Sequence, residues 1–440
     1  MKLSRYNFLR QIDGITIFFN SMTCALAIVD ENFLKAYREI ENGSFDESRH
    51  DPNLIANMKS SGCIIEDDID ELRLIDYSRG LEKFDRTLMS LTIVPTLDCN
   101  FRCKYCFEEH RKGSMNQATQ NRLIEFIRPH AERLKNLRVT WFGGEPLLEK
   151  EIIYSLSKRL LEICAEHQIN FDATIITNGS LIEDSDIEQF KRCKIRHVQI
   201  TIDGIKEVHD QRRRSIDGSS TFDHLLKIVD LLAENEILIN VRVNIDQENV
   251  SRVDELLETM KSRIKHFERV IVNFGRVTAL NEVCRSVESD CYNPEQFADI
   301  MLPLHQKVLE YGFKTSTMIL YPKSKRNYCG AEIVNFFMID SDGTIYKCWN
   351  DVGILERRCG NLFDKPNRPS HEFLEWIQRS PMQFEECHDC KVLPLCMGGC
   401  PHLARRSNDG NPVCDSIKFN IDRILRFYYE RLKGVKKNGG

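Results

Sequence analysis

The chain has 440 residues, of which 42% are hydrophobic and 29% are charged, and its formal net charge is -5. This composition is typical of a globular protein with two or three domains. The acidic excess argues against nucleic acid as a partner, because phosphate contacts call for basic surfaces.

The location of the protein limits how its cysteines can be used. No run of about 18 apolar residues occurs, and residues 1–14 lack the apolar core of a signal peptide. We therefore expect a cytoplasmic protein with no membrane partner. The chain has 17 cysteines, and a reducing compartment makes metal or cluster ligation a better explanation than disulfides for those that lie close together.

The first 85 residues form a predicted unit of their own. Apolar segments at 6–12, 14–20 and 24–30 are typical of short strands, and the periodicity at 31–42 and 52–60 predicts helices. A small domain of three strands and packed helices follows from this order.

Residues 91–275 alternate between strand and helix patterns. Six apolar, β-branched runs predict buried parallel strands at 91–96, 137–142, 171–177, 197–202, 237–244 and 270–274. Segments of helical period lie between them, such as 120–134 and 223–236. The pattern predicts an α/β sheet or an incomplete barrel built from βαβ units.

Polar or glycine-bearing segments follow these strands directly. They are the cysteines from Cys99 onward, Gly143 to Pro146, Thr177 to Gly179, Asp203 with Gly204, and Asn244. The carboxyl ends of parallel strands are where α/β sheets and barrels bind ligands, so we expect a site at this edge.

The segment after the first strand has three thiols, Cys99, Cys103 and Cys106, in a C-x3-C-x2-C spacing. Thiolates favour zinc or iron–sulfur clusters. A cubane cluster has four irons, so three cysteines leave one iron open to a ligand that is not protein. S-adenosylmethionine, chelating through its amino and carboxylate groups, is such a ligand.

This motif, followed by the aromatic Phe107 and by the GGEP segment, resembles the signature of the radical SAM superfamily. The resemblance implies a partial (β/α)6 TIM-like barrel over residues 90–312. It also implies a [4Fe-4S] cluster that cleaves S-adenosylmethionine to a 5'-deoxyadenosyl radical. By the same likeness Gly143, Gly144 and Glu145 line the methionine end of S-adenosylmethionine.

Further S-adenosylmethionine contacts are expected from the strand ends. The residues implied for the ribose and carboxylate are Asn178, Thr201, Arg213 and Asn244. Arg213 is chosen because the HDQRR segment resembles an H-D-x-x-R stretch of the family. The catalytic acid or base stays unknown. Glu108, Glu109, His110 and Asp340 lie near the motifs, but a solvated surface role is the expectation for each.

A second group of cysteines lies near the C-terminus, at positions 387, 390, 396, 400 and 414, with Cys329 and Cys348 upstream. Taken alone, a C-x2-C pair followed by further cysteines suits structural zinc. Beside the first motif, the set resembles the SPASM domain, which implies two auxiliary clusters within residues 313–440.

A fourth cysteine close to the third often binds a neighbouring cluster, as in two-cluster ferredoxins. We therefore assign one cluster to Cys387, Cys390, Cys396 and Cys414. The other is assigned to Cys329, Cys348 and Cys400. Relatives that mature sulfatases have an extra cysteine after the first, where this chain has GAEIVNFFM. One iron of the second cluster is thus expected to be open to substrate, or else to be closed by Cys359, a water or a carboxylate.

The strand and helix order of residues 1–85 resembles the winged-helix-like (β3α3) domain that binds precursor-peptide leaders, and a plain packing domain is the alternative. Together the resemblances imply a maturase that installs a thioether or carbon–carbon cross-link in a ribosomally made peptide. It would use three [4Fe-4S] clusters and an external reductant such as flavodoxin or ferredoxin.

Other functions stay open at this point. One is a maturase that oxidises Cys or Ser of an anaerobic sulfatase to formylglycine, and the others are a zinc-binding adaptor without catalysis and a cluster-bearing electron carrier. The sequence names neither the peptide, the modified residue and the bond formed, nor the oligomeric state.

Overall fold

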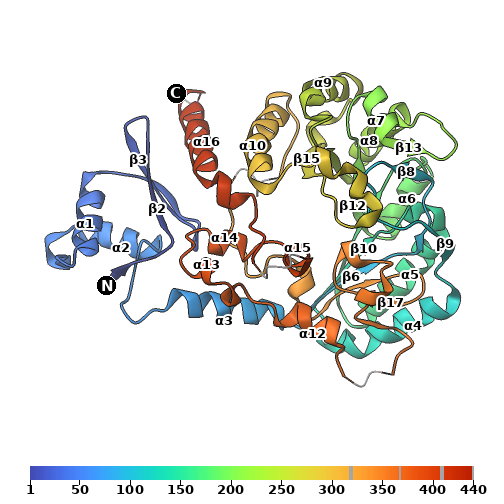
Figure 1. The fold of residues 1–440 in the computed structure, drawn as a ribbon, viewed down its shortest axis with the longest axis horizontal. Helices are drawn as coiled ribbons and strands as arrows, with labels where there is room; N and C mark the ends of the chain where they lie inside the picture. Colours follow the sequence, from blue (N-terminus) through green and yellow to red (C-terminus); the bar gives the residue numbers. More distant parts are fainter. Residues whose placement is uncertain (317–320, 366–367, 407–410, 439–440) are drawn as a thin grey trace. The chain divides into compact units, whose positions relative to one another are not determined.

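The computed structural model describes residues 1–316, 321–365, 368–406 and 411–438. The chain divides into two compact units (Figure 1). Unit 1 consists of Met1–Lys83, Thr317–Cys329 and Arg379–Gly440, and unit 2 consists of Phe84–Ser316 and Gly330–Gln378. Within the described residues, no helix is both long enough and apolar enough to cross a bilayer.

Unit 2 is built on a nine-stranded sheet in the order β15-β14-β12-β11-β10-β6-β16-β17-β18. Six consecutive strands of this sheet, starting at its β15 edge, run parallel: β6 (Leu88–Ile93), β10 (Asn136–Trp141), β11 (Asn170–Thr177), β12 (Ile195–Thr201), β14 (Leu238–Ile245) and β15 (Ile271–Arg276). All six predicted strands are present, in the expected parallel arrangement. The α/β prediction is confirmed, and the sheet agrees with a partial barrel.

Helices cover one face of this sheet (Figure 1). They are α4 (Gln117–Ile127), α5 (Lys150–Glu166), α6 (Asp186–Arg192), α8 (Phe222–Glu234), α9 (Val253–Arg263) and α10 (Pro294–Glu310). Their apolar side chains and those of the strands form one continuous core. Asn116 caps α4 by accepting from the Thr119 amide at 2.9 Å. The helical pattern predicts a single helix over 120–134, but the α-helix ends at Ile127 and a 3-10 helix follows it. Pro129 explains the change, because proline has no backbone N–H to donate inside an α-helix.

The alternation along β14 separates two faces of the sheet. Ile239, Val241, Val243 and Ile245 are buried under the helices, whereas residues 240, 242 and 244 keep some accessible surface. We call the face that carries Asn240, Arg242 and Asn244 the inner face. Side chains on this face can meet a ligand, because the helical core does not cover them.

Short elements complete unit 2. The strands are β7 (Thr96–Leu97), β8 (Phe101–Cys103), β9 (Arg111–Ser114), β13 (Arg213–Ser215), β16 (Phe336–Ile339), β17 (Thr344–Tyr346) and β18 (Gly360–Asn361), and the helices are α7 (Lys206–Arg212) and α12 (His371–Gln378). β13 pairs with β8, and β7 pairs with β9. Both small sheets hold the cysteine segment in place.

Unit 1 begins with a small sheet and three helices. They are β1 (Lys2–Leu3), β2 (Asn7–Ile12), β3 (Ile15–Asn20), β4 (Leu26–Val29), α1 (Glu31–Glu41), α2 (Pro52–Ser60), β5 (Ile64–Ile65) and α3 (Glu71–Lys83). The three predicted strands form an antiparallel sheet in the order β2-β3-β4, and both predicted helices are present. A core around Phe18, Phe33 and Met58 joins them.

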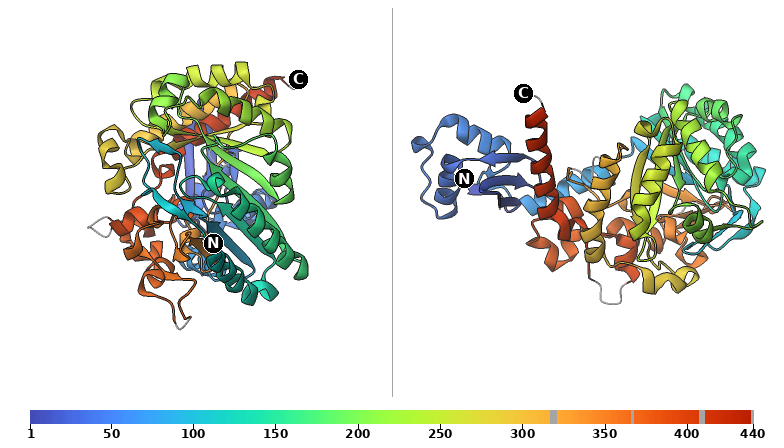
Figure 2. Two further views of the ribbon diagram at one scale, coloured as in Figure 1. Left: turned by 90° about the vertical axis from the view of Figure 1, so that its right-hand side faces the viewer. Right: turned by 90° about the horizontal axis from the view of Figure 1, so that it is seen from above.

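The C-terminal part of unit 1 contains α13 (Glu385–His388), α14 (Leu393–Cys396), α15 (Pro401–Arg406) and α16 (Ile417–Asn438). Phe8 and Phe19 of the N-terminal sheet pack with Leu395 and Leu425. Figure 2 shows the strands of the N-terminal sheet beside α16. The first and last segments therefore share apolar cores, whereas the predicted domains at 1–85, 90–312 and 313–440 are continuous in sequence.

Candidate functional site

The three thiols of the C-x3-C-x2-C motif lie in one loop after β6. The amide of Phe101 donates to the sulfur of Cys99 at 3.3 Å, and the amide of Cys106 donates to the carbonyl of Cys103 at 3.1 Å. Arg213 lies opposite Cys103 in the β8–β13 pair. Burial raises the pKa of Cys99 to about 12 and also raises the pKa of Cys103 and Cys106. Three desolvated thiols in one loop suit a soft metal cluster, because such a cluster replaces their protons.

The glycines of the GGEP segment lie directly against the start of this loop. A Cβ on Gly143, whose φ is +123°, would lie 2.4 Å from the carbonyl oxygen of Thr96. A Cβ on Gly144 would lie 2.2 Å from the carbonyl oxygen of Asp98. Only glycine allows this approach of the two backbones. The structure thus places both predicted glycines beside the cysteine loop.

Glu145 is fully buried, with 0% exposure, and joins the ends of two strands. Its carboxylate accepts from the Thr177 hydroxyl at 2.7 Å, the Asn178 amide at 2.7 Å and the Leu147 amide at 3.0 Å. Burial raises the pKa of Glu145 although these bonds oppose the shift. In this structure the carboxylate holds this edge of the sheet in place, and we call the edge the rim. Both carboxylate oxygens already accept hydrogen bonds.

Asn178 connects the end of β11 to the cysteine loop. Its side-chain amide donates to Asn100, next to Cys99, at 2.8 Å, and its oxygen accepts from the Ser180 amide at 2.9 Å. Thr201 ends β12 and lies beside Arg242 in the parallel register. Both predicted residues are therefore at the expected edge of the sheet.

Tyr105 is the centre of a polar network that the sequence reasoning missed. Its hydroxyl accepts from Arg213 at 2.8 Å and from Asn244 at 3.0 Å, and donates to Asp203 in a short bond. Burial lowers the pKa of Arg213, but Cys103, Tyr105 and Asp203 outweigh this effect and raise it well above the usual value. Two predicted residues, Arg213 and Asn244, thus meet on one tyrosine. The aromatic residue between the second and third cysteines was the available signal.

Two of the acidic residues expected at the surface are buried. Glu108 is 5% exposed, and burial raises its pKa to about 8. Asp340 is 1% exposed and accepts from the amides of Asp342 and Thr344 in a tight turn. The surface expectation is therefore wrong for these two, because loop packing covers Glu108 and the turn engages Asp340. Nε2 of His110 lies 3.7 Å from the sulfur of Cys106.

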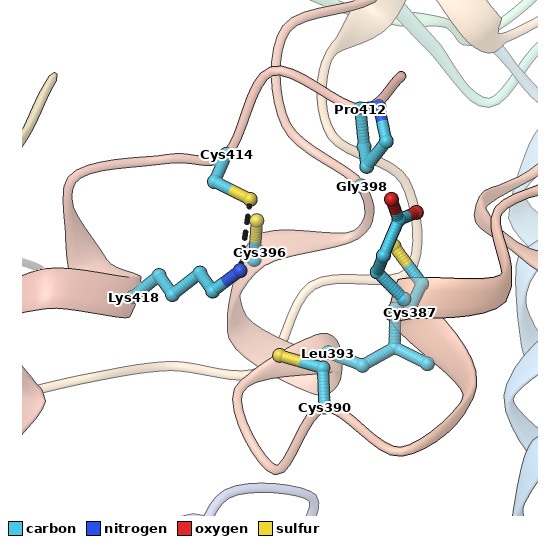
Figure 3. A pocket seen from close by; sticks show the side chains of 9 residues that line it. Cys387, Cys390, Leu393, Cys396, Gly398, Pro412, Cys414 and Lys418 are labelled. Atoms are coloured by element: carbon cyan, nitrogen blue, oxygen red, sulfur yellow. Dashed lines mark hydrogen bonds between the residues drawn. The ribbon is translucent and has the colours of Figure 1, made fainter. Parts of the chain in front are cut away.

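A second group of thiols lies in unit 1. Cys387, Cys390, Cys396 and Cys414 line one cavity, together with Leu393, Gly398, Pro412, Lys418 and Glu386. Figure 3 shows these four cysteines around the cavity and the ammonium of Lys418 against the sulfur of Cys414, at 3.4 Å. Burial raises the pKa of Cys387 to about 12 and that of Cys396 to about 11. The four thiols assigned to one cluster are thus brought together.

Left-handed backbone shapes this cavity. Met397, Gly398 and Gly399 have φ values of +50°, +77° and +68° and turn the chain directly after Cys396. A Cβ on Gly399 would lie 1.7 Å from the carbonyl oxygen of Val413, so glycine is required where the segment before Cys414 passes.

The remaining predicted ligands belong to different units. Cys329 and Cys400 are in unit 1, where the amide of Cys400 donates to the carbonyl of Val413 at 3.2 Å. Cys348 and Cys359 are in unit 2, are both 8% exposed, and share an apolar cluster with Trp376. Cys359 is therefore beside a predicted ligand, but the assignment of Cys329, Cys348 and Cys400 to one cluster stays a prediction.

Four of the six remaining cysteines are buried, which is typical of inert thiols. Cys63, Cys164, Cys193 and Cys284 are buried, whereas Cys24 and Cys291 are partly exposed.

Known proteins resemble this chain over its length. A serine-type anaerobic sulfatase-maturating enzyme of Klebsiella aerogenes is 25% identical, and the match covers 77% of this chain and 86% of that enzyme. The radical SAM cyclopropyl synthase TigE of Paramaledivibacter caminithermalis is 24% identical over 98% of this chain and 96% of that protein. The structure of Streptococcus suis SuiB bound to the precursor peptide SuiA matches with a TM-score of 0.55 and 16% identity. That match covers 94% of this chain and 99% of SuiB.

Residues 93–260 match the model of the radical SAM superfamily. This range begins at the last residue of β6 and includes the cysteine loop, the two glycines, the Tyr105 network and the inner face of β14. A domain of this kind implies S-adenosylmethionine and an iron–sulfur cluster, which the three thiols of the loop suit. These residues therefore form a radical SAM domain, and the chain is an enzyme.

Proposed function

We propose that the enzyme modifies a ribosomally made precursor peptide and installs a thioether or carbon–carbon cross-link. The cluster and S-adenosylmethionine supply, when bound, a 5'-deoxyadenosyl radical that takes a hydrogen atom from the peptide. The loop of Cys99, Cys103 and Cys106 would hold this cluster. Gly143, Gly144, Asn178, Thr201, Arg213 and Asn244 would hold S-adenosylmethionine, with Glu145 fixing the rim beneath it.

The extent of the similarity supports a peptide cross-linking enzyme. The match to the sulfatase-maturating enzyme leaves about a quarter of this chain uncovered, since it covers 77%. The matches to TigE and to SuiB cover 98% and 94%. The sequence outside the sulfatase-maturase match therefore has counterparts in a cyclopropyl synthase and in a protein that binds a precursor peptide.

The N-terminal sheet supports a site for a leader peptide. Among the described residues β4 pairs only with β3, so its other edge is open to an added strand. Ile28 on this strand is 54% exposed. A leader segment would gain main-chain hydrogen bonds along β4 and an apolar contact at Ile28.

An Ile28→Glu variant tests this assignment, because the side chain is exposed and the fold does not depend on it. We expect weaker binding of a leader-bearing peptide and unchanged cleavage of S-adenosylmethionine. Leu74→Glu is the matched control, since Leu74 in α3 is 41% exposed in the same segment. Equal peptide affinity of the Ile28 variant and the wild type would contradict the role of β4.

The four-thiol cavity of unit 1 supports auxiliary clusters. Cys387, Cys390, Cys396 and Cys414 suffice for one cubane, and Cys329, Cys348 and Cys400, with substrate or Cys359, would hold another. We propose three [4Fe-4S] clusters and an external reductant such as flavodoxin or ferredoxin. Iron and sulfide analysis after anaerobic reconstitution should give about twelve irons per chain, and about four would refute the auxiliary clusters.

Sulfatase maturation is the second candidate, and the Klebsiella aerogenes relative favours it. The two reactions differ in their products, because formylglycine is an aldehyde and a cross-link is not. A sulfatase-derived peptide and a leader-bearing precursor peptide should each be incubated with the reduced enzyme. A hydrazide-reactive product from the sulfatase peptide would replace our proposal. A cross-linked product with two hydrogen atoms fewer, unreactive to hydrazide, would support it.

A further inference from the structure

Arg242 stands on the inner face of β14, two residues before Asn244. In the parallel register its neighbours are Thr201 on β12 and Asn273 on β15. It lies within the polar edge of the sheet and keeps accessible surface. Its side chain therefore lies on the face of the sheet opposite the helical core, toward the inside of the partial barrel.

The surroundings hold the guanidinium in one position. Its Nε donates to Asn244 Oδ1 at 2.8 Å, and Asn244 is bonded in turn to Tyr105. The terminal nitrogens lie over Gly275, where a Cβ would be only 2.2 Å from Nη2. The absence of a side chain at Gly275 makes room for Arg242.

Next to Arg242 the inner face carries a row of hydrogen-bonded side-chain amides. Asn240 donates to Gln199 at 3.0 Å, and Asn273 donates to Asn240 at 2.9 Å. The amide of Ser316 donates to Asn273 at 3.2 Å. This row of amides spans three strands, and because amides are neutral it offers Arg242 no negative charge.

Arg242 differs in this respect from the other arginines at the edge. Arg212 pairs with Asp246 at 2.7 Å and with Glu248 at 3.0 Å, and Arg213 is bonded to Tyr105. Among the described residues, no carboxylate lies within ion-pair distance of Arg242. Asp203 is engaged by Tyr105 and by the Asn244 amide.

A partly buried cation without a counter-ion is costly unless a ligand supplies the charge. Burial lowers the pKa of Arg242, and Tyr105 and Asp203 only partly offset this effect. The planar guanidinium matches a carboxylate, which can accept two parallel N–H bonds. The unfavourable free energy of the unpaired guanidinium in the free enzyme is thus consistent with a role in binding a carboxylate.

We propose that Arg242 binds a carboxylate group inside the partial barrel. This inference rests on the proposed function, which supplies two sources of that group: the methionine carboxylate of S-adenosylmethionine, or an acidic residue or C-terminus of the peptide. Arg242 is a binding residue in this assignment, and Gly275 is a positioning residue that leaves its guanidinium in place.

The first arm of the test uses S-adenosylmethionine and its decarboxylated analogue as probes on the reconstituted enzyme. Affinities are measured anaerobically for the wild type, Arg242→Gln and Arg242→Lys. We define the preference as the affinity for S-adenosylmethionine divided by the affinity for the analogue. If S-adenosylmethionine is the source of the carboxylate, this preference should be about tenfold higher in the wild type than in Arg242→Gln. Arg242→Lys should retain part of this preference, because it keeps the charge without the fork geometry.

The second arm uses two short peptides, N-acetyl-Ala-Glu-Ala-amide and N-acetyl-Ala-Gln-Ala-amide, with S-adenosylmethionine present. Binding is followed by saturation-transfer NMR. If the peptide is the source, the wild type should bind the Glu peptide about tenfold more tightly than the Gln peptide, and Arg242→Gln should bind them equally.

Two further variants separate direct binding from other effects. Gly275→Ala keeps the charge but displaces the guanidinium, so it should lose the same preference as Arg242→Gln. Arg138→Gln is the matched control, because Arg138 is exposed on β10 and its loss should change neither preference. Iron content and melting temperature check that every variant is folded and loaded.

The proposal fails if the wild type and Arg242→Gln discriminate equally in both arms. It also fails if Gly275→Ala keeps the full preference. The charge of Arg242 would then act on the ligand at long range, without direct contact between the guanidinium and the carboxylate. A wild-type enzyme that binds no S-adenosylmethionine would instead refute the proposed function.

Discussion

The cysteine loop of unit 2 and the four-cysteine cavity of unit 1 hold their thiols by different means. The loop is fixed by side chains from several strand ends, with Tyr105, Glu145 and Asn178 as its main connections. The cavity is shaped by backbone conformation at Met397–Gly399 and by a close approach to Val413. The first site should therefore be sensitive to changes in hydrogen bonding, and the second to added side-chain volume.

The largest effect is expected from removing the ligands of the loop. Replacing Cys99, Cys103 and Cys106 together with Ala should abolish cleavage of S-adenosylmethionine and lower the iron content by about four per chain. The iron of unit 1 should remain, because its thiols lie in another segment. Chromatographic detection of 5'-deoxyadenosine under dithionite measures the activity. Continued production by the triple variant would refute the ligand assignment.

Gly399→Ala should break the cavity of unit 1 and leave the loop intact. A Cβ at Gly399 would clash with the Val413 carbonyl at 1.7 Å in a left-handed conformation. We expect a loss of about 2 kcal/mol or more in stability and of iron bound by unit 1. Chemical denaturation and iron analysis measure the two effects.

Gly43→Ala is the matched control for this change. Gly43 has a φ of +74°, and a Cβ there would meet nothing within 4 Å. Its substitution should cost only about 1 kcal/mol, from the backbone conformation alone. Equal losses in the two variants would show that the contact with Val413 is unimportant.

Tyr105→Phe should weaken the loop's function without removing its ligands. Arg213, Asn244 and Asp203 would lose their shared partner, and the rim that we assign to S-adenosylmethionine would lose its order. We expect about a tenfold lower rate of S-adenosylmethionine cleavage, equivalent to about 1.4 kcal/mol, with iron content unchanged.

Tyr154→Phe provides the comparison for this hydroxyl. Tyr154 of α5, in the same unit, donates to Asp186 at 2.7 Å, and this bond involves no residue of the Tyr105 network. Its loss should lower stability and leave cleavage of S-adenosylmethionine unchanged. A similar loss of cleavage in both variants would indicate a general stability effect.

The smallest effect is expected at Lys418, whose ammonium lies 3.4 Å from the sulfur of Cys414. Lys418→Met should lower the reduction potential of a cluster in the cavity by on the order of 10 to 30 mV, because reduction adds negative charge. Solvent screening keeps the effect small. Lys418→Arg should restore the potential in an EPR-monitored redox titration, and an unchanged potential in both would show that the contact is unimportant.

The sequence predicts much of this fold because local patterns determine it. The six parallel strands follow from β-branched apolar runs, and the site at their carboxyl ends follows from the topology of parallel sheets. The helix pattern at 120–134 was predicted too long, because Pro129 outweighs the apolar periodicity.

The contacts inside the site could not be predicted in the same way. Tyr105 bonds with residues 98, 108 and 139 positions away, and no local pattern encodes such distances. The burial of Glu108 and the shared apolar cores of the first and last segments of unit 1 likewise depend on tertiary packing.

The apolar core shared by the first and last segments of unit 1 determines when, during translation, these segments can pack. Phe8 and Phe19 need Leu395 and Leu425 to complete their packing, and about 300 residues separate the two segments. A ribosome takes on the order of tens of seconds to cover that distance. The core around Phe18 and Phe33 can form early, since its members lie within the first 64 residues. The remaining apolar surface stays exposed until synthesis is nearly finished, so nascent chains should need chaperone protection, and iron can enter the four-thiol cavity only late in biogenesis.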